Sequence, residues 1–73
     1  MRIVIYSKDN CSFCDRAREL LKSQVKEYIE YKLDKDFTRE TIKAVFPTAK
    51  TFPVIVINND YIGGYTELAE KLK

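Results

Sequence analysis

Two cysteines, Cys11 and Cys14, are the residues of this sequence best suited to chemistry, because they stand three positions apart. The segment Cys11-Ser12-Phe13-Cys14 follows an apolar run and opens a predicted helix. Cysteines at this spacing on a first helical turn lie about 5 Å apart at Cα, within the usual range for a disulfide. The pair could therefore close and reopen with little backbone movement, as thiol–disulfide exchange requires.

The start of a helix makes the two sulfurs unequal. Cys11 stands at or just before the first turn, where unpaired backbone N–H groups and the positive end of the helix dipole favour an anion. Lys8 adds a second favourable charge, which Asp9 and Asp15 oppose. We therefore expect a raised thiolate fraction at Cys11. Cys14 should be more buried, so Cys11 is predicted to attack and Cys14 to resolve the mixed disulfide.

Other roles for the cysteine pair are less well supported by the sequence. A structural disulfide over so short a loop would restrict the unfolded chain by only about 2 kcal/mol on the loop-entropy estimate. A zinc site needs four ligands, commonly further cysteines or histidines. The sequence has no His and no third Cys, so a complete zinc site within one chain is excluded, and no metal is expected in the main interpretation.

Alternating strands and helices are predicted to position the cysteines. The β-branched run at 2–6 predicts a strand, and residues 12–24 predict a helix. The face shared by this helix's apolar side chains is predicted to hold Phe13, Ala17, Leu20 and Leu21. Residues 27–33 alternate in hydropathy, which predicts a strand with one wetter face. One face of this strand is predicted to carry Ile29, Tyr31 and Leu33. The other face is predicted to carry Tyr28, Glu30 and Lys32.

A second helix and a hairpin follow. Residues 38–46 predict a helix capped by Asp36 or Thr38 and ended by Pro47. Its inward face is predicted to hold Ile42, Val45 and Phe46. The apolar run at 54–57 predicts a strand covered on both faces, and it is joined through the turn residues 58–60 to a short strand at 61–62. A last helix is predicted at 67–72, capped by Thr66, with Leu68, Ala69 and Leu72 facing inward.

The predicted order is β-α-β-α-β-β-α, which places the chain in the α/β class as a single domain of residues 1–73. The early βαβ unit predicts a parallel pair of strands, and the hairpin predicts an antiparallel pair. The helices can then cover both faces of a four-stranded mixed sheet.

Composition narrows the partners. Hydrophobic residues make up 45% of the chain, which predicts a folded domain. The 13 basic and 11 acidic residues are interleaved, and a net charge of +2 gives no reason to expect nucleic-acid binding. No apolar run reaches the roughly 20 residues of a membrane span, and Ile3 is too close to Met1 for a signal peptide. We expect a cytoplasmic protein, where paired cysteines are more often catalytic than structural.

Three further motifs connect the cysteine pair to a known family. A strand, a C-x-x-C sequence and a helix followed by βαβ are typical of the thioredoxin-like fold. Thr51-Phe52-Pro53 stands before the apolar strand, where such proteins place a cis-proline facing the active cysteine. Tyr6-Ser7-Lys8 and Gly63-Gly64 resemble the corresponding segments of glutaredoxins. The chain therefore resembles a small dithiol glutaredoxin of bacterial or phage type over essentially its whole length.

The resemblance implies a glutathione-dependent thiol–disulfide oxidoreductase with glutathione as co-substrate. It implies that Lys8 and, less directly, Arg39 meet the glycine carboxylate of glutathione, and Arg16 is a weaker candidate for the same role. Gly64, Tyr65 and Thr66 are implied to hold the γ-glutamyl end at a helix start. The remaining implied contacts are Phe13, inside the cysteine motif, and the backbone clamp of Thr51 and Phe52 before a cis Pro53.

Departures from the family pattern keep alternatives open. Many dithiol members have Pro-Tyr between the cysteines, whereas this chain has Ser12-Phe13. Some glutaredoxins with serine there assemble a [2Fe–2S] cluster across a dimer with bound glutathione, which is the second hypothesis. Val54 replaces a common glutamine, and Thr66-Glu67 replaces a common Ser-Asp or Asp-Asp pair, which bears on glutathione affinity.

A third hypothesis keeps the reaction and replaces glutathione with a flavoprotein thioredoxin reductase as the electron donor. The expected partners are glutathione and disulfide-containing client proteins. Ribonucleotide reductase is a common family client, although no residue here points to it. A monomer without nucleic-acid or membrane partners is expected.

Overall fold

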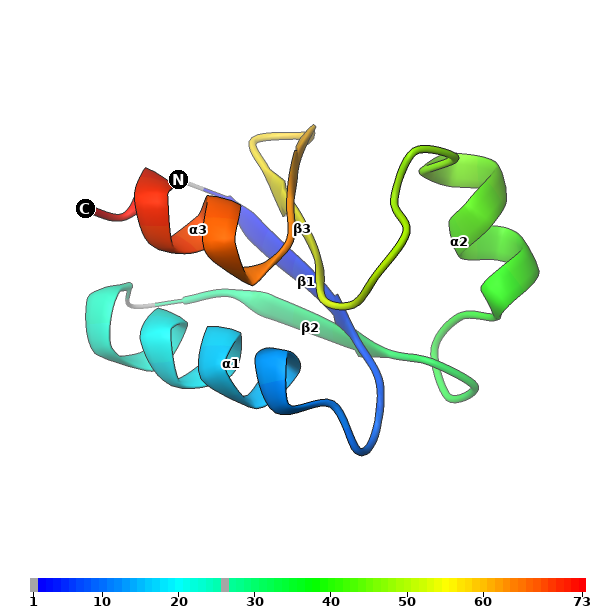
Figure 1. Ribbon diagram of the computed structural model, residues 1–73, viewed down its shortest axis with the longest axis horizontal. Helices are drawn as coiled ribbons and strands as arrows, with labels where there is room; N and C mark the ends of the chain where they lie inside the picture. Colours follow the sequence, from blue (N-terminus) through cyan, green and yellow to red (C-terminus); the bar gives the residue numbers. More distant parts are fainter. Residues whose placement is uncertain (1, 26) are drawn as a thin grey trace.

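A computed structural model describes residues 2–25 and 27–73 of the chain (Figure 1). Its elements, in chain order, are β1 (Ile3–Ser7), α1 (Ser12–Gln24), β2 (Ile29–Lys32), α2 (Arg39–Val45), β3 (Val54–Ile57), β4 (Asp60–Gly63) and α3 (Tyr65–Lys71). The strands form one four-stranded sheet in the order β2-β1-β3-β4. Strands β1 and β2 are parallel, and the other neighbouring pairs are antiparallel. The predicted thioredoxin-like α/β architecture and element order are confirmed.

The main core lies between the sheet and helices α1 and α3, which lie together on one side of the sheet, with α2 on the other (Figure 1). Alternate residues of β1 and β3 point into this core, as period-two strands require. Its buried members are Ile3, Ile5, Ala17, Leu21, Ile55, Ile57 and Leu68. Within the part of the chain that the structure describes, none of the helices has the length and hydropathy of a membrane span.

The helix caps agree only partly with prediction. Thr38 caps α2, because its side-chain oxygen accepts a hydrogen bond from the Thr41 N–H at 3.2 Å. Helix α3 begins at Tyr65 with Gly64 as its N-cap, so the predicted start at Glu67 and the predicted Thr66 cap are wrong. The carboxylate of Glu67 accepts the Gly64 N–H at 2.7 Å, which satisfies the helix start without a Thr66 side chain.

Two residues predicted to face inward are exposed. Phe13 lies at the surface of α1, because the inward stripe of that helix is Cys14, Ala17 and Leu21, at helical spacing. Val45 is exposed on α2, whose buried residue is Ile42. Phe13 and Val45 therefore lie outside the buried face of their helices, and their apolar side chains are exposed because of where the helix geometry places them.

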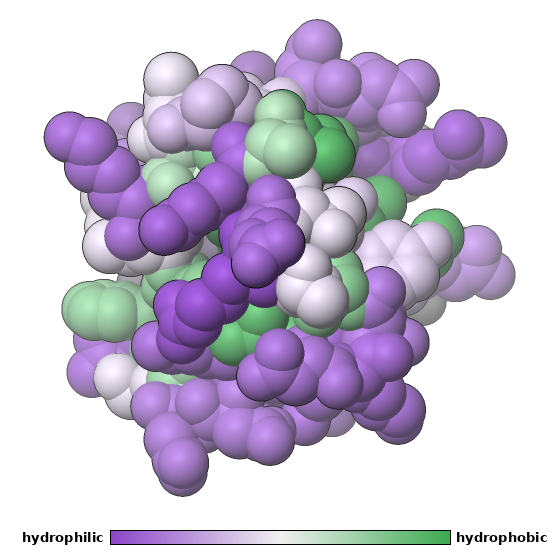
Figure 2. Space-filling view, turned by 90° about the vertical axis from the view of Figure 1, so that its right-hand side faces the viewer, coloured by the Kyte–Doolittle hydropathy of each residue, from purple (hydrophilic) through white to green (hydrophobic). Residues whose placement is uncertain are grey.

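The second face of the sheet carries an aromatic cluster under α2. The Tyr6 ring lies 5.4–5.5 Å, centroid to centroid, from the rings of Tyr31, Phe37 and Phe46, and Phe46 lies 5.6 Å from Tyr61. Helix α2 covers this face incompletely. Seen from this side, the molecule shows apolar patches among hydrophilic residues (Figure 2).

The face of β2 that is more exposed to solvent is the one that carries its apolar residues. Ile29 and Tyr31 are 46% and 39% exposed, whereas Glu30 and Lys32 are half-buried. Glu30 faces α1, where the Arg18 guanidinium donates hydrogen bonds to its carboxylate at 2.7–3.1 Å. The buried Ser7 hydroxyl donates a further bond at 2.6 Å. These partners draw the carboxylate toward the core side and leave the apolar residues of this edge strand on the thinly covered face.

We expect Glu30→Gln to destabilise the fold by about 1–3 kcal/mol, because it removes the charge that Arg18 and Ser7 bind. Hydrogen bonds from Arg18 lower the pKa of Glu30 below its ordinary value of 4.5 against the opposing effect of burial, and Ser7 adds to the lowering. The stabilisation is therefore fully present above pH 4.5 and is lost as the pH falls through the lower pKa of the folded state.

Urea unfolding of wild type and Glu30→Gln between pH 7 and pH 2 measures this difference in the free energy of unfolding. The difference should shrink below pH 4.5. Glu19→Gln, on the exposed side of α1, is the matched control and should lie near wild type. A difference that stays constant down to pH 2 would contradict the role of the ionised carboxylate.

Candidate active site

Cys11 and Cys14 form a disulfide at the start of α1, with their Cα atoms 5.2 Å apart. Cys11 is the N-cap of the helix, and its Sγ accepts a hydrogen bond from the Cys14 N–H at 3.2 Å. Cys14 is completely buried, whereas Cys11 keeps 9% of its surface exposed. The predicted difference in burial is confirmed, and the helix-start N–H is directed at the sulfur that would carry a thiolate when the pair is reduced.

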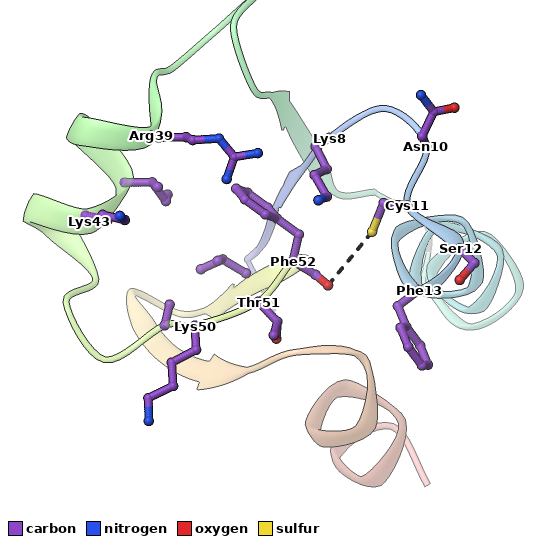
Figure 3. Close-up of a pocket in the computed structure, with 13 residues that line it drawn as sticks. Lys8, Asn10, Cys11, Ser12, Phe13, Arg39, Lys43, Lys50, Thr51 and Phe52 are labelled. Carbon is purple, nitrogen blue, oxygen red and sulfur yellow. Dashed lines mark hydrogen bonds between the residues drawn. The ribbon is translucent and has the colours of Figure 1, made fainter.

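The Phe52–Pro53 peptide bond is cis, as predicted, and Pro53 is buried. The carbonyl oxygen of Phe52 lies 3.8 Å from the Cys11 Sγ, the contact that Figure 3 marks with a dashed line. The backbone that precedes β3 therefore faces the sulfur of Cys11, the more accessible of the two cysteines, and can pair with an extended substrate next to it.

A cavity of about 390 Å³ opens beside Cys11. Besides the predicted catalytic Cys11, it is lined by five of the predicted binding residues: Lys8, Phe13, Arg39, Thr51 and Phe52. Figure 3 shows Lys8 and Phe52 between Cys11 and helix α2, with Arg39 directed toward them from α2. The loop after β1, the start of α1, helix α2 and the segment before β3 thus converge on one cavity.

Aromatic contacts fix the position of Phe52 in this cavity. The Lys8 Nζ lies 5.8 Å from the centroid of the Phe52 ring, which is cation–π distance. The Phe37 ring stacks on Phe52 at 6.1 Å. Lys8 is thereby held beside Cys11, over the ring whose backbone faces the sulfur.

A second cavity, of about 180 Å³, adjoins the first and shares Phe13, Thr51 and Phe52 with it. Gly64, Tyr65 and Thr66 at the start of α3 line its other side, together with Glu67. The Tyr65 ring lies 6.1 Å from the Phe13 ring. Every predicted binding residue except the buried Pro53 therefore lines one of two adjoining cavities. Arg16 lines neither cavity. Its guanidinium lies over the ring of Phe13, with the Arg16 Cζ 5.5 Å from the ring centroid.

Sequence reasoning missed several lining residues. Asn10, Ser12, Lys43 and Lys50 line the larger cavity, and Glu67 lines the smaller one. Lys43 follows Arg39 by four positions on α2, a spacing that places both on one side of a helix. Glu67 follows Gly64 by three positions, which is the spacing of a capping box. Both spacings are visible in the sequence, although neither indicates a cavity by itself.

Among residues 2–25 and 27–73, no three His, Cys, Asp or Glu side chains gather closely enough to hold a metal ion. The chemistry that the described residues assemble is that of the cysteine pair. A disulfide at a helix start, faced by the backbone before a cis-proline, defines a thiol–disulfide oxidoreductase of the thioredoxin-like fold.

Comparison with known proteins gives the family. The glutaredoxin family model matches residues 3–62 of the chain. The chain belongs to the glutaredoxin family, whose members are thiol–disulfide oxidoreductases. The predicted family and reaction class are confirmed.

Individual relatives agree with this assignment. The chain is 37% identical over 68 residues to a probable glutaredoxin of Synechocystis, covering 92% of this chain and 62% of the length of that protein. It is 30% identical over 82 aligned positions to glutaredoxin 1 of Escherichia coli, covering all of this chain and 94% of that one. The solved buckwheat glutaredoxin–glutathione complex superposes with a TM-score of 0.80 at 28% identity, covering 94% of this chain and 66% of that one.

Proposed function

We propose that residues 1–73 form a single, monomeric domain that reduces protein disulfides and glutathione mixed disulfides, with glutathione as its reductant. The observation that supports glutathione is the distribution of charge around Cys11. Cations line the larger cavity on one side, and the Glu67 carboxylate lines the smaller cavity on the other. Glutathione has a free carboxylate at its glycine end, and both an ammonium and a carboxylate at its γ-glutamyl end.

The larger cavity takes the glycine end in this proposal. Lys8 and Arg39 both line it, and either can pair with the glycine carboxylate. The backbone of Thr51 and Phe52 pairs with the cysteinyl residue, whose sulfur then lies beside the Cys11 Sγ. Pro53 directs that backbone toward the sulfur.

The smaller cavity takes the γ-glutamyl end. The first backbone N–H groups of a helix lack intrahelical partners, so those of Tyr65 and Thr66 are suited to the γ-glutamyl carboxylate. Glu67 lies beside them for the ammonium group, and Phe13 lines both cavities. This orientation uses each charge of glutathione once.

The proposed reaction proceeds by thiolate displacement. The Cys11 thiolate attacks the glutathione sulfur of a mixed disulfide, the substrate thiol leaves, and a second glutathione releases oxidised glutathione and regenerates Cys11. With a protein disulfide, Cys11 first bonds to the client sulfur. Cys14 then displaces the client thiol and closes the Cys11–Cys14 disulfide. Two glutathione molecules reopen it, which a potential in the family range of roughly −200 to −230 mV permits.

Steady-state reduction of a glutathione mixed disulfide, coupled to glutathione reductase and NADPH, tests the proposal. We expect turnover that saturates with glutathione. Lys8→Gln should raise the KM for glutathione about three- to tenfold, since it removes one charge-assisted contact. Lys22→Gln, which removes an exposed charge from the last turn of α1, is the matched control. Turnover that proceeds with thioredoxin reductase and no glutathione would instead support the reductase-driven hypothesis.

A second candidate function rests on Ser12, which stands where many dithiol members have proline and lines the cavity beside Cys11. Cys11 of two copies, each with one glutathione, would supply the four sulfur ligands of a [2Fe–2S] cluster. Anaerobic reconstitution with iron and sulfide should then give a coloured dimer on a sizing column. A colourless monomer without bound iron would exclude this function.

A further inference from the structure

The larger cavity has an uncompensated positive charge. Among the residues that the structure describes, four basic side chains and no acidic side chain line it: Lys8, Arg39, Lys43 and Lys50. In the described part of the chain, the ion pairs use Arg18 and Lys32, so none of these four cations is paired. A cleft lined by one sign of charge attracts ligands of the opposite sign and raises their rate of encounter.

These cations exceed what one glutathione requires. In the proposed function, Lys8 and Arg39 meet its glycine carboxylate, and its other charged groups lie in the smaller cavity. Lys43 and Lys50 remain without a role. Figure 3 places Cys11 on one side of the cavity and Arg39, Lys43 and Lys50 on the other, with Lys50 extending away from Cys11. The positive surface therefore continues past the position given to glutathione.

The floor between these cations is apolar. Ile42 and Val54 are buried there, and Ala49 and Phe52 are half-buried beside them. An apolar floor with a charged rim fits a polypeptide segment, whose apolar side chains cover the floor while its carboxylates meet the rim. A small inorganic anion would use only the rim.

We propose that the preferred protein clients of this chain carry their disulfide in an acidic segment, with Asp or Glu close to the reacting cysteine, and that Lys43 and Lys50 select such segments. The inference rests on the proposed function only for the position of glutathione. In the reaction, the Cys11 sulfur bonds to one client sulfur and the client disulfide breaks. Cys14 then displaces the client, which gains two electrons and leaves with two thiols, while the Cys11–Cys14 pair is oxidised to its disulfide.

Single-turnover reduction of model peptides tests the selection without glutathione. The protein is first reduced with dithiothreitol and desalted, then mixed with one of three cyclic disulfide peptides of the same core, flanked by two Glu, two Gln or two Lys residues. We expect the Glu peptide to react about tenfold faster than the Lys peptide at low ionic strength, because a tenfold rate difference corresponds to the free energy of about two exposed ion pairs. The ratio should fall strongly at about 0.5 M salt.

Two double variants test whether Lys43 and Lys50 cause the preference for the Glu peptide. Lys43→Gln with Lys50→Gln should lower the Glu-to-Lys ratio to about a third of its wild-type value, since Lys8 and Arg39 stay in the cavity wall. Lys22→Gln with Lys71→Gln removes the same charge from the last turns of α1 and α3, outside both cavities, and should keep the ratio. Thermal unfolding of each variant shows that the fold is retained.

Equal rates for the Glu and Lys peptides with wild-type protein would overturn the inference. So would a ratio that keeps its wild-type value in the Lys43/Lys50 double variant, or a failure of the reduced protein to react with any of the peptides. Glutathione-coupled turnover of a small mixed disulfide by the wild type is measured in parallel. A flat peptide ratio with normal turnover refutes only the selection of acidic clients, whereas a clear ratio without turnover refutes only the proposed use of glutathione.

Discussion

Cys11→Ser is expected to abolish the reduction of a glutathione mixed disulfide, lowering kcat/KM by at least about a thousandfold, because it removes the nucleophile. Cys14→Ser should retain this activity within about tenfold, since a glutathione mixed disulfide can be reduced through one sulfur. The structure explains why the two cysteines should differ in their importance for this reaction. Cys11 lies in the cavity wall with a backbone N–H directed at its sulfur, and Cys14 is fully buried beneath it.

With a protein disulfide as substrate, Cys14→Ser should fail at a later step than Cys11→Ser. With a disulfide-bridged peptide, Cys14→Ser should stop at the mixed disulfide between Cys11 and the peptide, because the resolving thiol is absent. Mass spectrometry of the quenched reaction detects this adduct, and steady-state assays measure turnover. Ser12→Ala, a change inside the motif that keeps both sulfurs, is the control for disturbance of the helix start. An equal loss of mixed-disulfide turnover in Cys11→Ser and Cys14→Ser would contradict the assigned roles.

The parts of the fold that the sequence predicts well are those decided by local patterns. Helix α1 has its predicted bounds, Ser12–Gln24, because Cys11 caps its start and the buried residues Cys14, Ala17 and Leu21 follow at helical spacing. The turn between β3 and β4 is likewise visible in the sequence. Asn58 and Asn59 both adopt positive φ, which asparagine accommodates more readily than most residues. The cis bond at Pro53 follows from the resemblance and not from any local pattern.

The parts that differ depend on contacts between distant segments. Nothing near Glu30 in the sequence shows that Arg18 and Ser7 will hold its carboxylate on the core side of β2. The cationic surface is another such case. Lys43 and Lys50 read as ordinary solvated lysines until α2 and the segment before β3 bring them to the wall of one cavity with Cys11. Such sites become visible only when the topology is known.

Gly63→Ala is expected to destabilise the fold by about 2–4 kcal/mol, combining backbone strain with a steric clash. Gly63 has φ of +127°, which residues with a Cβ rarely adopt. A Cβ there would lie 2.5 Å from the Glu67 Cγ and 2.6 Å from its Oε1. Glu67 would have to move, and its hydrogen bond with the Gly64 N–H would break. Urea unfolding measures the loss of stability.

Gly64→Ala is the matched control for stability. Gly64 has φ of −107°, and the nearest atom to its added Cβ is the Pro53 carbonyl oxygen at 3.3 Å, so the loss should be no more than about 1 kcal/mol. A larger loss for Gly64→Ala than for Gly63→Ala would contradict this explanation.

The strain and the clash at Gly63 can be separated with Glu67→Ala. In that background the clashing side chain is absent, so Gly63→Ala should cost only the backbone term of about 1–3 kcal/mol. The KM for glutathione gives a second readout. Because Glu67 caps the N–H of Gly64 at the start of α3, Gly63→Ala should also shift the N–H groups proposed to hold the γ-glutamyl carboxylate and raise this KM. A KM that stays at the wild-type value in a folded Gly63→Ala protein would mean that the start of α3 positions no part of glutathione.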